Sequence, residues 1–435
     1  MEDAAKIIQS LPGVCEYRWS CKDISKRFPV VNPVTGKTTT VVQAGDSGTN
    51  GKPLKDASFD VGFLVQVFRY SGSVLDKLPS EFFDQGNICY SVIYGPHGVC
   101  VGILPFNWPP VHAGGKLAPC LAVGNTMVLK PGEQTPLTLM RIVAILQSIF
   151  PAEPVQADPG LSPEVPQTLI HHKLVKMVSL TGSTASGSKA AQTAAVSLAP
   201  AVLQLCGKDA LVFADADLNL MVRDTIDGAF VDKGETCTAA SRILLHQDLY
   251  PTLVSRLSAA VVKLRTGDGL DETTHIGPVD SRERQQEILK YIEPGNARAR
   301  LSRLKAIYPR PLTSEMTISQ TEIFGPVATV GLFETEDQVV ELVNASSYGL
   351  FAGAYSANFT RTMRVARRLD VGVVLVNNLF RAFLGTLFGG VKDSEYGREH
   401  WLGALREWSR IKSVCFPSGL GPIPCRSGAI DVCKL

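Results

Sequence analysis

Residues 99–130 read VCVGILPFNWPPVHAGGKLAPCLAVGNTMVLK, and this stretch decides the fold class. Residues 99–104 are an apolar run with β-branched side chains, which predicts a buried strand. A Pro-rich loop at 105–110 follows, then helical periodicity over 111–122 and a second apolar strand over 126–130. A strand, a helix and a strand in this order form a βαβ unit, whose two strands lie parallel in one sheet.

The same alternation continues along most of the chain and predicts an α/β fold. Residues 88–103, broken by Gly95-Pro96-His97-Gly98, predict a β-hairpin. The other expected elements are a short strand within 29–36, strands at 176–180, 201–205 and 242–246, helices at 60–79, 137–150, 186–198, 218–231, 237–241 and 248–265, and further elements at 327–333, 337–344, 351–356, 359–370 and 373–377.

Length and composition place the chain among soluble globular proteins. It has 435 residues, 45% hydrophobic and 19% charged, so more than one domain is expected. A net charge of +2 gives no reason to expect nucleic acid as a partner, and no apolar stretch is long enough to span a membrane. The 10 cysteines include no C-x-x-C pair, which argues against a zinc ribbon, and we expect no metal site.

Cys237 is the first candidate for chemistry, in Gly234-Glu235-Thr236-Cys237-Thr238. One helical pattern ends at Gly234 and another is expected to begin beside the cysteine. A helix N-terminus would lower the pKa of the thiol and favour the thiolate, which suits a nucleophile. The alternative is an ordinary buried thiol.

Three loops that follow expected strands are further candidates, because ligands bind at the carboxyl ends of strands in open α/β sheets. Asn107 could donate a hydrogen bond to an oxyanion, or simply form a turn. Lys130 and Glu133 could bind ribose hydroxyls, or form a solvated turn. The loop from Thr181 to Gly187 could bind a phosphate through its backbone amides, although it is neither G-x-G-x-x-G nor a Walker loop.

The order of these motifs resembles the NAD(P)-dependent aldehyde dehydrogenase superfamily over roughly residues 29–415. The motifs that carry the resemblance are Asn32-Pro-Val-Thr-Gly36, Gly51-Lys-Pro-Leu54, Pro105-Phe-Asn107-Trp-Pro, Lys130-Pro-x-Glu133-Gln-Thr-Pro, Thr181-Gly-Ser-Thr-x-x-Gly187, Leu205-Cys-Gly-Lys, Gly234-x-x-Cys237, Glu322-Ile-Phe-Gly-Pro-Val327, Phe388-Gly-Gly-Val-Lys-x-Ser394 and Gly397-Arg-Glu399.

The resemblance implies a Rossmann-like cofactor domain, an α/β catalytic domain and a β-hairpin oligomerisation arm. The expected boundaries are 1–85 and 103–206 for the NAD-binding domain, 207–407 for the catalytic domain, 86–102 and 408–416 for the arm, and 417–435 for a mobile tail. An arm of this kind implies a homodimer or homotetramer.

The resemblance also assigns roles to single residues. Cys237 would attack an aldehyde, with Asn107 and the Cys237 backbone amide as the oxyanion site. Lys130 and Glu133 would hold the adenosine ribose. The remaining cofactor positions are Gly182, Ser183 and Gly187 near the phosphates, Glu322 at the nicotinamide ribose and Phe324 near the ring. NAD is the expected cofactor because an acid at 133 would repel a 2′-phosphate, and NADP stays possible.

The chain also departs from the family at several places. The family's general base is a glutamate at the start of Glu-Leu-Gly-Gly-Lys, where this chain has Gln204-Leu-Cys206-Gly-Lys, and a neutral amide cannot accept a proton. The segment between Gly36 and Gly51 is shorter than the family's, and so is the segment from Glu293 to Glu322. Hydrolysis is therefore expected to be slow, with a burst of NADH before a slower steady rate.

Three functions remain open from the sequence. The first is NAD-dependent oxidation of a small-molecule aldehyde to a carboxylic acid through a cysteine thioester. The second is a non-catalytic or deacylation-impaired relative that binds nucleotide and assembles. The third is an acylating enzyme with a thiol or amine acceptor. We expect a cytoplasmic or peroxisomal protein, because the chain ends in Cys433-Lys434-Leu435, one substitution from the peroxisomal signal Ser-Lys-Leu.

Overall fold

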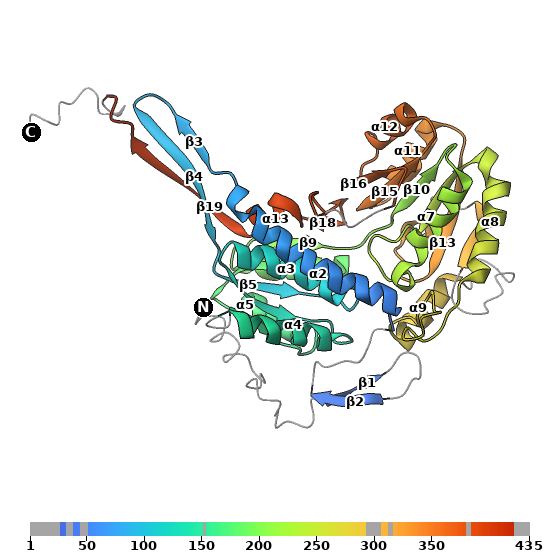
Figure 1. Cartoon of the computed structure of the whole chain (residues 1–435), viewed down its shortest axis with the longest axis horizontal. Coiled ribbons are helices and arrows are strands. Elements are labelled where there is room, and N and C mark those ends of the chain that lie inside the picture. Colours follow the sequence, from blue (N-terminus) through green and yellow to red (C-terminus); the bar gives the residue numbers. More distant parts are fainter. Residues whose placement is uncertain are drawn as a thin grey trace, which may run out of the picture.

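The computed structural model describes residues 27–31, 38–43, 51–150, 154–292, 306–311, 316–379 and 384–421. Two lobes, each built on a six-stranded sheet, lie side by side, and a three-stranded arm projects from one of them (Figure 1). The motif at 32–36 and the tail from 422 onward lie outside the described residues, and so do most of the residues before Gly51.

The first lobe contains a sheet in the strand order β18-β9-β8-β5-β6-β7. Five neighbouring strands are parallel, and β18 is antiparallel to β9 at the edge. The strands are β5 Val99–Ile103, β6 Thr126–Lys130, β7 Val155–Ala157, β8 Val175–Thr181, β9 Ala201–Gln204 and β18 Glu395–Tyr396. The helices of this lobe are α2 Leu54–Val74, α3 Pro109–Ala122, α4 Pro136–Ile149, α5 Glu164–His171, α6 Thr184–Val196 and α13 Trp401–Glu407.

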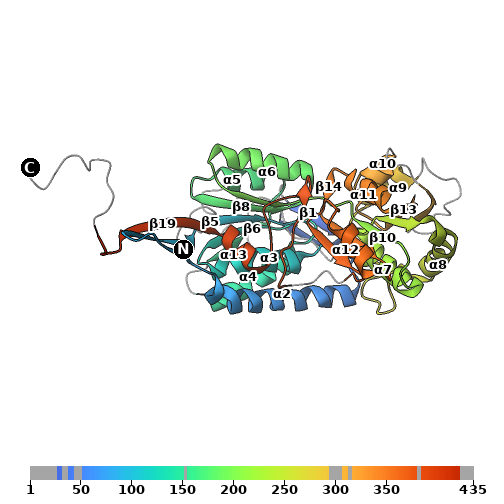
Figure 2. The ribbon, with the colours of Figure 1, turned by 90° about the horizontal axis from the view of Figure 1, so that it is seen from above.

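Helices cover both faces of this sheet (Figure 2). Successive side chains of a strand point to opposite faces. Val101 and Ile103 therefore pack in the cluster under α5 and α6, whereas Cys100 packs in the cluster under α3 and α4. Burial on both faces explains why the sequence of β5 is an uninterrupted apolar run rather than an alternating one.

The second lobe is built on the all-parallel sheet β12-β13-β11-β10-β15-β16. It follows the same rule: Leu211 of β10 packs toward α7 and α8, and Val212 packs on the opposite side toward α11 and α12. The strands are β10 Ala210–Phe213, β11 Arg242–His246, β12 Ala306–Pro311, β13 Val327–Phe333, β15 Phe351–Tyr355 and β16 Val373–Val376. The helices are α7 Leu218–Phe230, η3 Val231–Gly234, η4 Gln247–Leu249, α8 Tyr250–Lys263, α9 Arg282–Ile292, α10 Thr317–Gln320, α11 Glu336–Asn344 and α12 Phe359–Ala366.

The arm is an antiparallel sheet in the order β19-β4-β3. Its strands are β3 Glu81–Asp84, β4 Ile88–Pro96 and β19 Ser409–Pro417, and it follows η2 Leu75–Lys77 at the end of α2. The hairpin expected over 88–103 is wrong, because β4 pairs with β3 and β19 while β5 pairs with β6 and β8. Gly98, with φ +118°, lies at the break and lets the chain leave one sheet for the other.

Two further sheets have two strands each: β1 Arg27–Val31 with β2 Thr38–Gln43, and β14 Tyr348–Gly349 with β17 Val391–Lys392. The expected helix over 60–79 begins earlier, as α2, and ends at Val74 before a single turn of 3₁₀ helix. The expected helix over 237–241 is absent, since these residues form a turn and an irregular segment between η3 and β11. Within the described ranges, no helix has the length and apolar character of a membrane span.

Lys116 of α3 is a fully buried cation of the first lobe, and its Nζ donates to Glu399 Oε1 at 2.6 Å and to Ser179 Oγ at 2.8 Å. We predict that Lys116→Met lowers the free energy of unfolding by about 3–5 kcal/mol, because it leaves a buried carboxylate without its cation. Urea unfolding measures this. Lys77→Met, which removes the exposed ion pair with Asp76, should leave the midpoint unchanged; equal losses from both variants would contradict the argument.

Candidate active site

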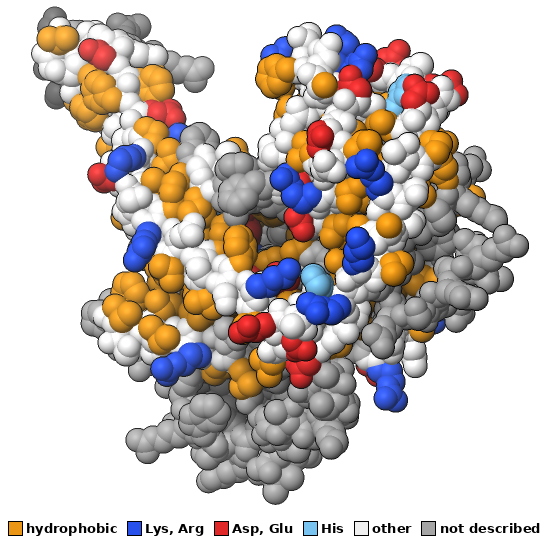
Figure 3. All heavy atoms as spheres, turned by 45° about the vertical axis from the view of Figure 1, so that its right-hand side comes forward, with side chains coloured by type: hydrophobic (Ala, Val, Ile, Leu, Met, Phe, Trp, Pro, Cys, Tyr) orange, Lys and Arg blue, Asp and Glu red, His pale blue; other side chains and the backbone are white. Residues whose placement is uncertain are grey.

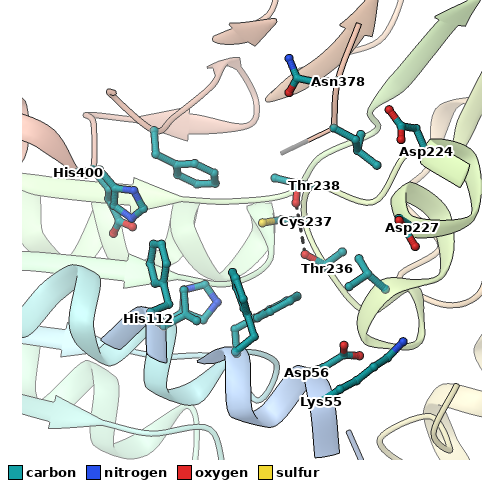
Figure 4. Close-up of a pocket in the computed structure, with 18 of the residues that line it drawn as sticks. Lys55, Asp56, His112, Asp224, Asp227, Thr236, Cys237, Thr238, Asn378 and His400 are labelled. Carbon is teal, nitrogen blue, oxygen red and sulfur yellow. Dashed lines mark hydrogen bonds between the residues drawn. The ribbon is translucent and has the colours of Figure 1, made fainter. Parts of the chain in front are cut away.

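A cavity of about 600 Å³ opens between the two lobes, and Cys237 lies in its wall. Figure 3 shows the hollow between the lobes, with hydrophobic side chains gathered in it. Figure 4 shows the Cys237 sulfur facing this space between Thr236 and Thr238, with His112 and His400 on the opposite side. Apolar and aromatic side chains dominate the lining: Phe59 and Phe63 of α2, Trp108, Val111, Val231, Leu379 and Phe388.

A strained turn places Cys237. Asp232, Lys233 and Gly234 adopt left-handed backbone conformations, with φ of 47°, 63° and 69°. A Cβ atom on Gly234 would lie 2.3 Å from the carbonyl oxygen of Gly325, so only glycine fits there. A buried ion pair between Lys233 and Glu235, at 2.9 Å, stabilises the turn against its strain.

The electrostatics at Cys237 differ from the sequence-based expectation. No helix begins at this residue, so the argument for a lowered pKa is wrong. Burial raises the pKa of the Cys237 thiol well above its ordinary value, and the negative charges of Glu322 and Asp209 raise it further. Without a bound cation the cysteine is therefore held as a thiol at neutral pH.

Asn107 follows β5 and joins the Cys237 turn directly. Its side chain is 3% exposed, and Nδ2 donates to the carbonyl oxygen of Glu235 at 2.9 Å. An amide nitrogen carries two hydrogens, so a second N–H remains for another acceptor. The structure thus brings Asn107 and Cys237 together from the two lobes.

Gln204, at the end of β9, is fully buried and lies opposite Glu395 of β18. With its amide nitrogen facing the carboxylate, Gln204 donates to Glu395 at 2.5 and 3.0 Å. The loop that follows Gln204 touches the cysteine turn, since a Cβ atom on Gly207 would lie 2.0 Å from the carbonyl oxygen of Cys237.

A second cavity, of about 460 Å³, lies at the carboxyl ends of β5, β6 and β8 and is lined by Lys130, Glu133 and Gly182. Lys130 forms an ion pair with Glu133, whose Oε1 also accepts the backbone N–H of Ser162 at 2.7 Å. Burial alone would raise the pKa of Glu133, but the charge and hydrogen bond of Lys130 hold it below the ordinary value. Glu133 is therefore ionised at neutral pH.

The loop between β8 and α6 borders this second cavity. Ser183 caps α6, because its hydroxyl oxygen accepts the backbone N–H of Ser186 at 3.1 Å. Gly187 packs against Leu205, whose side chain would lie 2.3 Å from a Cβ atom at this position. Gly182 and Ser186 line the cavity itself, so the N-terminus of α6 faces it.

Glu322 lies beside the loop that follows Gln204, and Phe324 lies beside Phe106. Glu322 accepts the backbone N–H of Gly207 at 3.1 Å and a hydrogen bond from the Cys206 thiol. Burial raises the pKa of Glu322 to about 7. Phe324, with φ +55°, packs edge-on against Phe106, which lines the second cavity.

Sequence reasoning missed the walls of the main cavity. His112 is one turn along α3 from Trp108, and burial lowers the pKa of His112 to about 3, so its ring is neutral. His400 stacks on Phe388 with ring centroids 5.3 Å apart. The spacing of Phe59 and Phe63, four residues apart on one helix, was the available signal for an apolar face.

We predict that iodoacetamide alkylates Cys237 more slowly than it alkylates free N-acetylcysteine at pH 7.5, because the raised pKa leaves little thiolate at Cys237. Raising the pH to about 9.5 should increase the rate at Cys237, since a larger fraction of the thiol is then ionised. Mass spectrometry of peptides from a timed reaction measures both rates. Faster labelling of Cys237 at pH 7.5 would contradict this electrostatic picture.

Comparisons with known proteins agree with the geometry. The sequence model described as "Aldehyde dehydrogenase family" matches residues 46–414. The chain is 66% identical to "Aldehyde dehydrogenase citD" of Monascus ruber, with 100% of each chain covered, and 43% identical to "Aldehyde dehydrogenase" of Didymella fabae, with 94% and 96% covered. An aldehyde dehydrogenase from Bacillus cereus in complex with NAD+ superposes with a TM-score of 0.84 at 28% identity, over 90% of this chain and 94% of that one. The chain belongs to the aldehyde dehydrogenase family.

Proposed function

We propose that the protein oxidises an aldehyde to a carboxylic acid with NAD through a thioester on Cys237. The observation that carries this proposal is the hydrogen bond from Asn107 Nδ2 to the Glu235 carbonyl oxygen, which holds an oxyanion donor two residues from the cysteine. The cavity at this point is mostly apolar and large enough for a small organic aldehyde.

The residues of the second cavity fit a dinucleotide. Lys130 and Glu133 would hold the adenosine ribose, and Gly182 and Ser183 would lie at the phosphates beside the N-terminus of α6. Glu322 would hold the nicotinamide ribose, with Phe324 near the ring. When bound, the nicotinamide supplies a hydride acceptor. The Bacillus cereus relative is described in complex with NAD+, which supports this assignment.

The chain's own groups would act in sequence on the aldehyde. The Cys237 thiol first loses its proton to solvent; the thiolate then adds to the carbonyl carbon, and negative charge develops on the aldehyde oxygen. The second N–H of Asn107 and the backbone N–H of Cys237 would donate to that oxygen, and such preorganised donors are each worth about 2.7–4 kcal/mol. The buried Lys233–Glu235 pair keeps the turn, and therefore both donors, in place.

A second candidate, a deacylation-impaired relative, is favoured by one observation. Gln204 occupies the position of the family's base and is a fully buried amide. An acylating enzyme would need no base at that position. Both alternatives share the first half of the reaction, so a test that separates acylation from hydrolysis distinguishes them from the hydrolytic enzyme.

The arm is proposed to join copies of the chain in a homodimer or homotetramer. Its strands carry exposed apolar side chains, among them Phe82 at 62% and Ile411 at 65% exposure. Apolar side chains exposed on a projecting sheet are commonly covered in an assembly.

For Cys237 we predict that mixing the protein and NAD with a panel of aldehydes produces about one NADH per active site in the first turnover. Cys237→Ser should abolish this signal, because an alcohol is hardly ionised at neutral pH, while NAD still binds. Stopped-flow absorbance measures the NADH, and calorimetry measures the binding. NADH formation by the serine variant at the wild-type rate would exclude Cys237 as the nucleophile.

For cofactor choice we predict that NAD binds more tightly than NADP, because the ionised Glu133 would repel a 2′-phosphate. Glu133→Gln removes the charge at nearly constant size and should shift the ratio of the two dissociation constants toward NADP by about tenfold, equivalent to about 1.4 kcal/mol. Calorimetric titrations of wild type and variant give the ratios. Tighter binding of NADP by the wild type would be the contrary result.

A further inference from the structure

The sequence predicts a missing base, because Gln204 cannot accept a proton from water. Glu395 supplies a carboxylate next to it. The two residues are directly paired across antiparallel strands β9 and β18, and their side chains meet on the same face. The Gln204 amide donates to both carboxylate oxygens, at 2.5 and 3.0 Å, so the carboxylate lies one hydrogen bond from the position that the base would occupy.

Two segments that contact Glu395 lead to the cavity that contains Cys237. Its Oε2 accepts the backbone N–H of Gly390 at 2.7 Å, and the neighbouring Phe388 lines the cavity that contains Cys237. On the other side, the Gln204 strand leads within three residues to Gly207, which touches the carbonyl of Cys237. Glu395 keeps 8% of its surface exposed, whereas Gln204 keeps none.

The charge of Glu395 also acts at the site. It is among the negative charges that raise the pKa of the Cys237 thiol. Burial raises the pKa of Glu395 itself, and the nearby Glu399 adds to the effect. A carboxylate with a raised pKa is a stronger base, while the N–H donors of Gln204 and Gly390 stabilise its ionised form.

The other carboxylates near the cysteine have different partners. Glu399 is paired with the buried Lys116 at 2.6 Å, which makes it a weak base. Glu322 already accepts two hydrogen bonds on the cofactor side. Asp209 accepts the backbone N–H of Phe351 at 3.0 Å. Among these four carboxylates, Glu395 is the one that is hydrogen-bonded to Gln204.

We propose that Glu395 is the base that activates water for hydrolysis of the Cys237 thioester, in place of the side chain at 204. This inference rests on the proposed function. One proton of the water passes to the Glu395 carboxylate as the water oxygen bonds to the thioester carbon. The carbon–sulfur bond then breaks, and the electron pair stays on the Cys237 thiolate. The acyl group leaves as a carboxylic acid, and Glu395 afterwards releases its proton to solvent; no oxidant is needed.

The expected behaviour of the wild type changes accordingly. Gln204 alone predicts slow hydrolysis, whereas Glu395 predicts base-assisted hydrolysis in the wild type and an impaired step when Glu395 is replaced. Gln204→Glu alone should not increase the rate of thioester hydrolysis, because two carboxyl groups at hydrogen-bonding distance share a single proton.

Deacylation can be measured without the nucleotide. The probe p-nitrophenyl acetate acetylates cysteine thiolates directly, and prolonged incubation acetylates Cys237 despite its small thiolate fraction. After removal of the reagent, mass spectrometry of peptides follows the loss of the acetyl group from Cys237. We expect Glu395→Gln to be acetylated at least as fully as the wild type, because one of the negative charges that raise the pKa of Cys237 is gone. The variant should lose the acetyl group at least about tenfold more slowly, since general-base assistance is typically worth about 10²–10⁴-fold. Hydroxylamine, which attacks a thioester without a base, should restore fast loss.

Two further variants separate catalysis from structure. Gln204→Glu with Glu395→Gln keeps the amide–carboxylate hydrogen bond with its polarity reversed, and should recover much of the lost rate. Glu407→Gln, a partly buried glutamate of α13 outside the lining of the two cavities, is the matched control and should behave as wild type. If Glu395→Gln loses the acetyl group as fast as the wild type, the inference about Glu395 is wrong but the proposed function still stands. Failure of Cys237 to form an acetyl-enzyme in the wild type would overturn the proposed function as well.

Discussion

The hydrogen bond from the Asn107 amide to the Glu235 carbonyl oxygen is the contact on which the site depends. Asn107 follows a strand of one lobe, and Glu235 belongs to a turn of the other. Because the bond is buried, breaking it would leave a buried carbonyl oxygen without this donor, at a cost of about 1–3 kcal/mol. It therefore fixes the Asn107 amide relative to the turn that carries Cys237, across the boundary between the two lobes.

The turn at residues 232–234, which precedes Glu235, keeps a strained backbone conformation at the site. Three successive left-handed residues turn the backbone sharply, and only Gly234 adopts this conformation at no steric cost. Asp232 is held there by its buried ion pair with Lys52, at 3.5 Å, and Lys233 by its ion pair with Glu235. Cys237 therefore faces the cavity from a turn rather than from a helix. Its pKa is set by burial and by the charges of neighbouring carboxylates, not by a helix dipole.

Apolar runs and loop motifs predicted much of the fold and of the candidate site. The expected strand over 126–130 coincides with β6, and 99–104 differs from β5 by one residue, because a strand buried on both faces must be apolar throughout. The expected hairpin was wrong because local turn signals at Gly95–Gly98 do not reveal which sheet each strand joins. Likewise, the helix expected at Cys237 was wrong because its sequence does not show that Asp232 and Lys233 are left-handed.

The sequence could not predict that Glu395 lies beside Gln204, and the reason differs from those above. Glu395 lies far from Gln204 in the sequence, and only the antiparallel pairing of two short strands brings them together. Their residue types then constrain each other. A carboxylate at both positions would bury two like charges within one hydrogen bond, so one of them would have to take up a proton. An amide facing a carboxyl group satisfies the hydrogen-bonding atoms of both residues and leaves a single acid in the pair. The amide at 204 and the acid at 395 are therefore complementary members of one hydrogen-bonded pair, and the residue type at each position limits the residue type at the other.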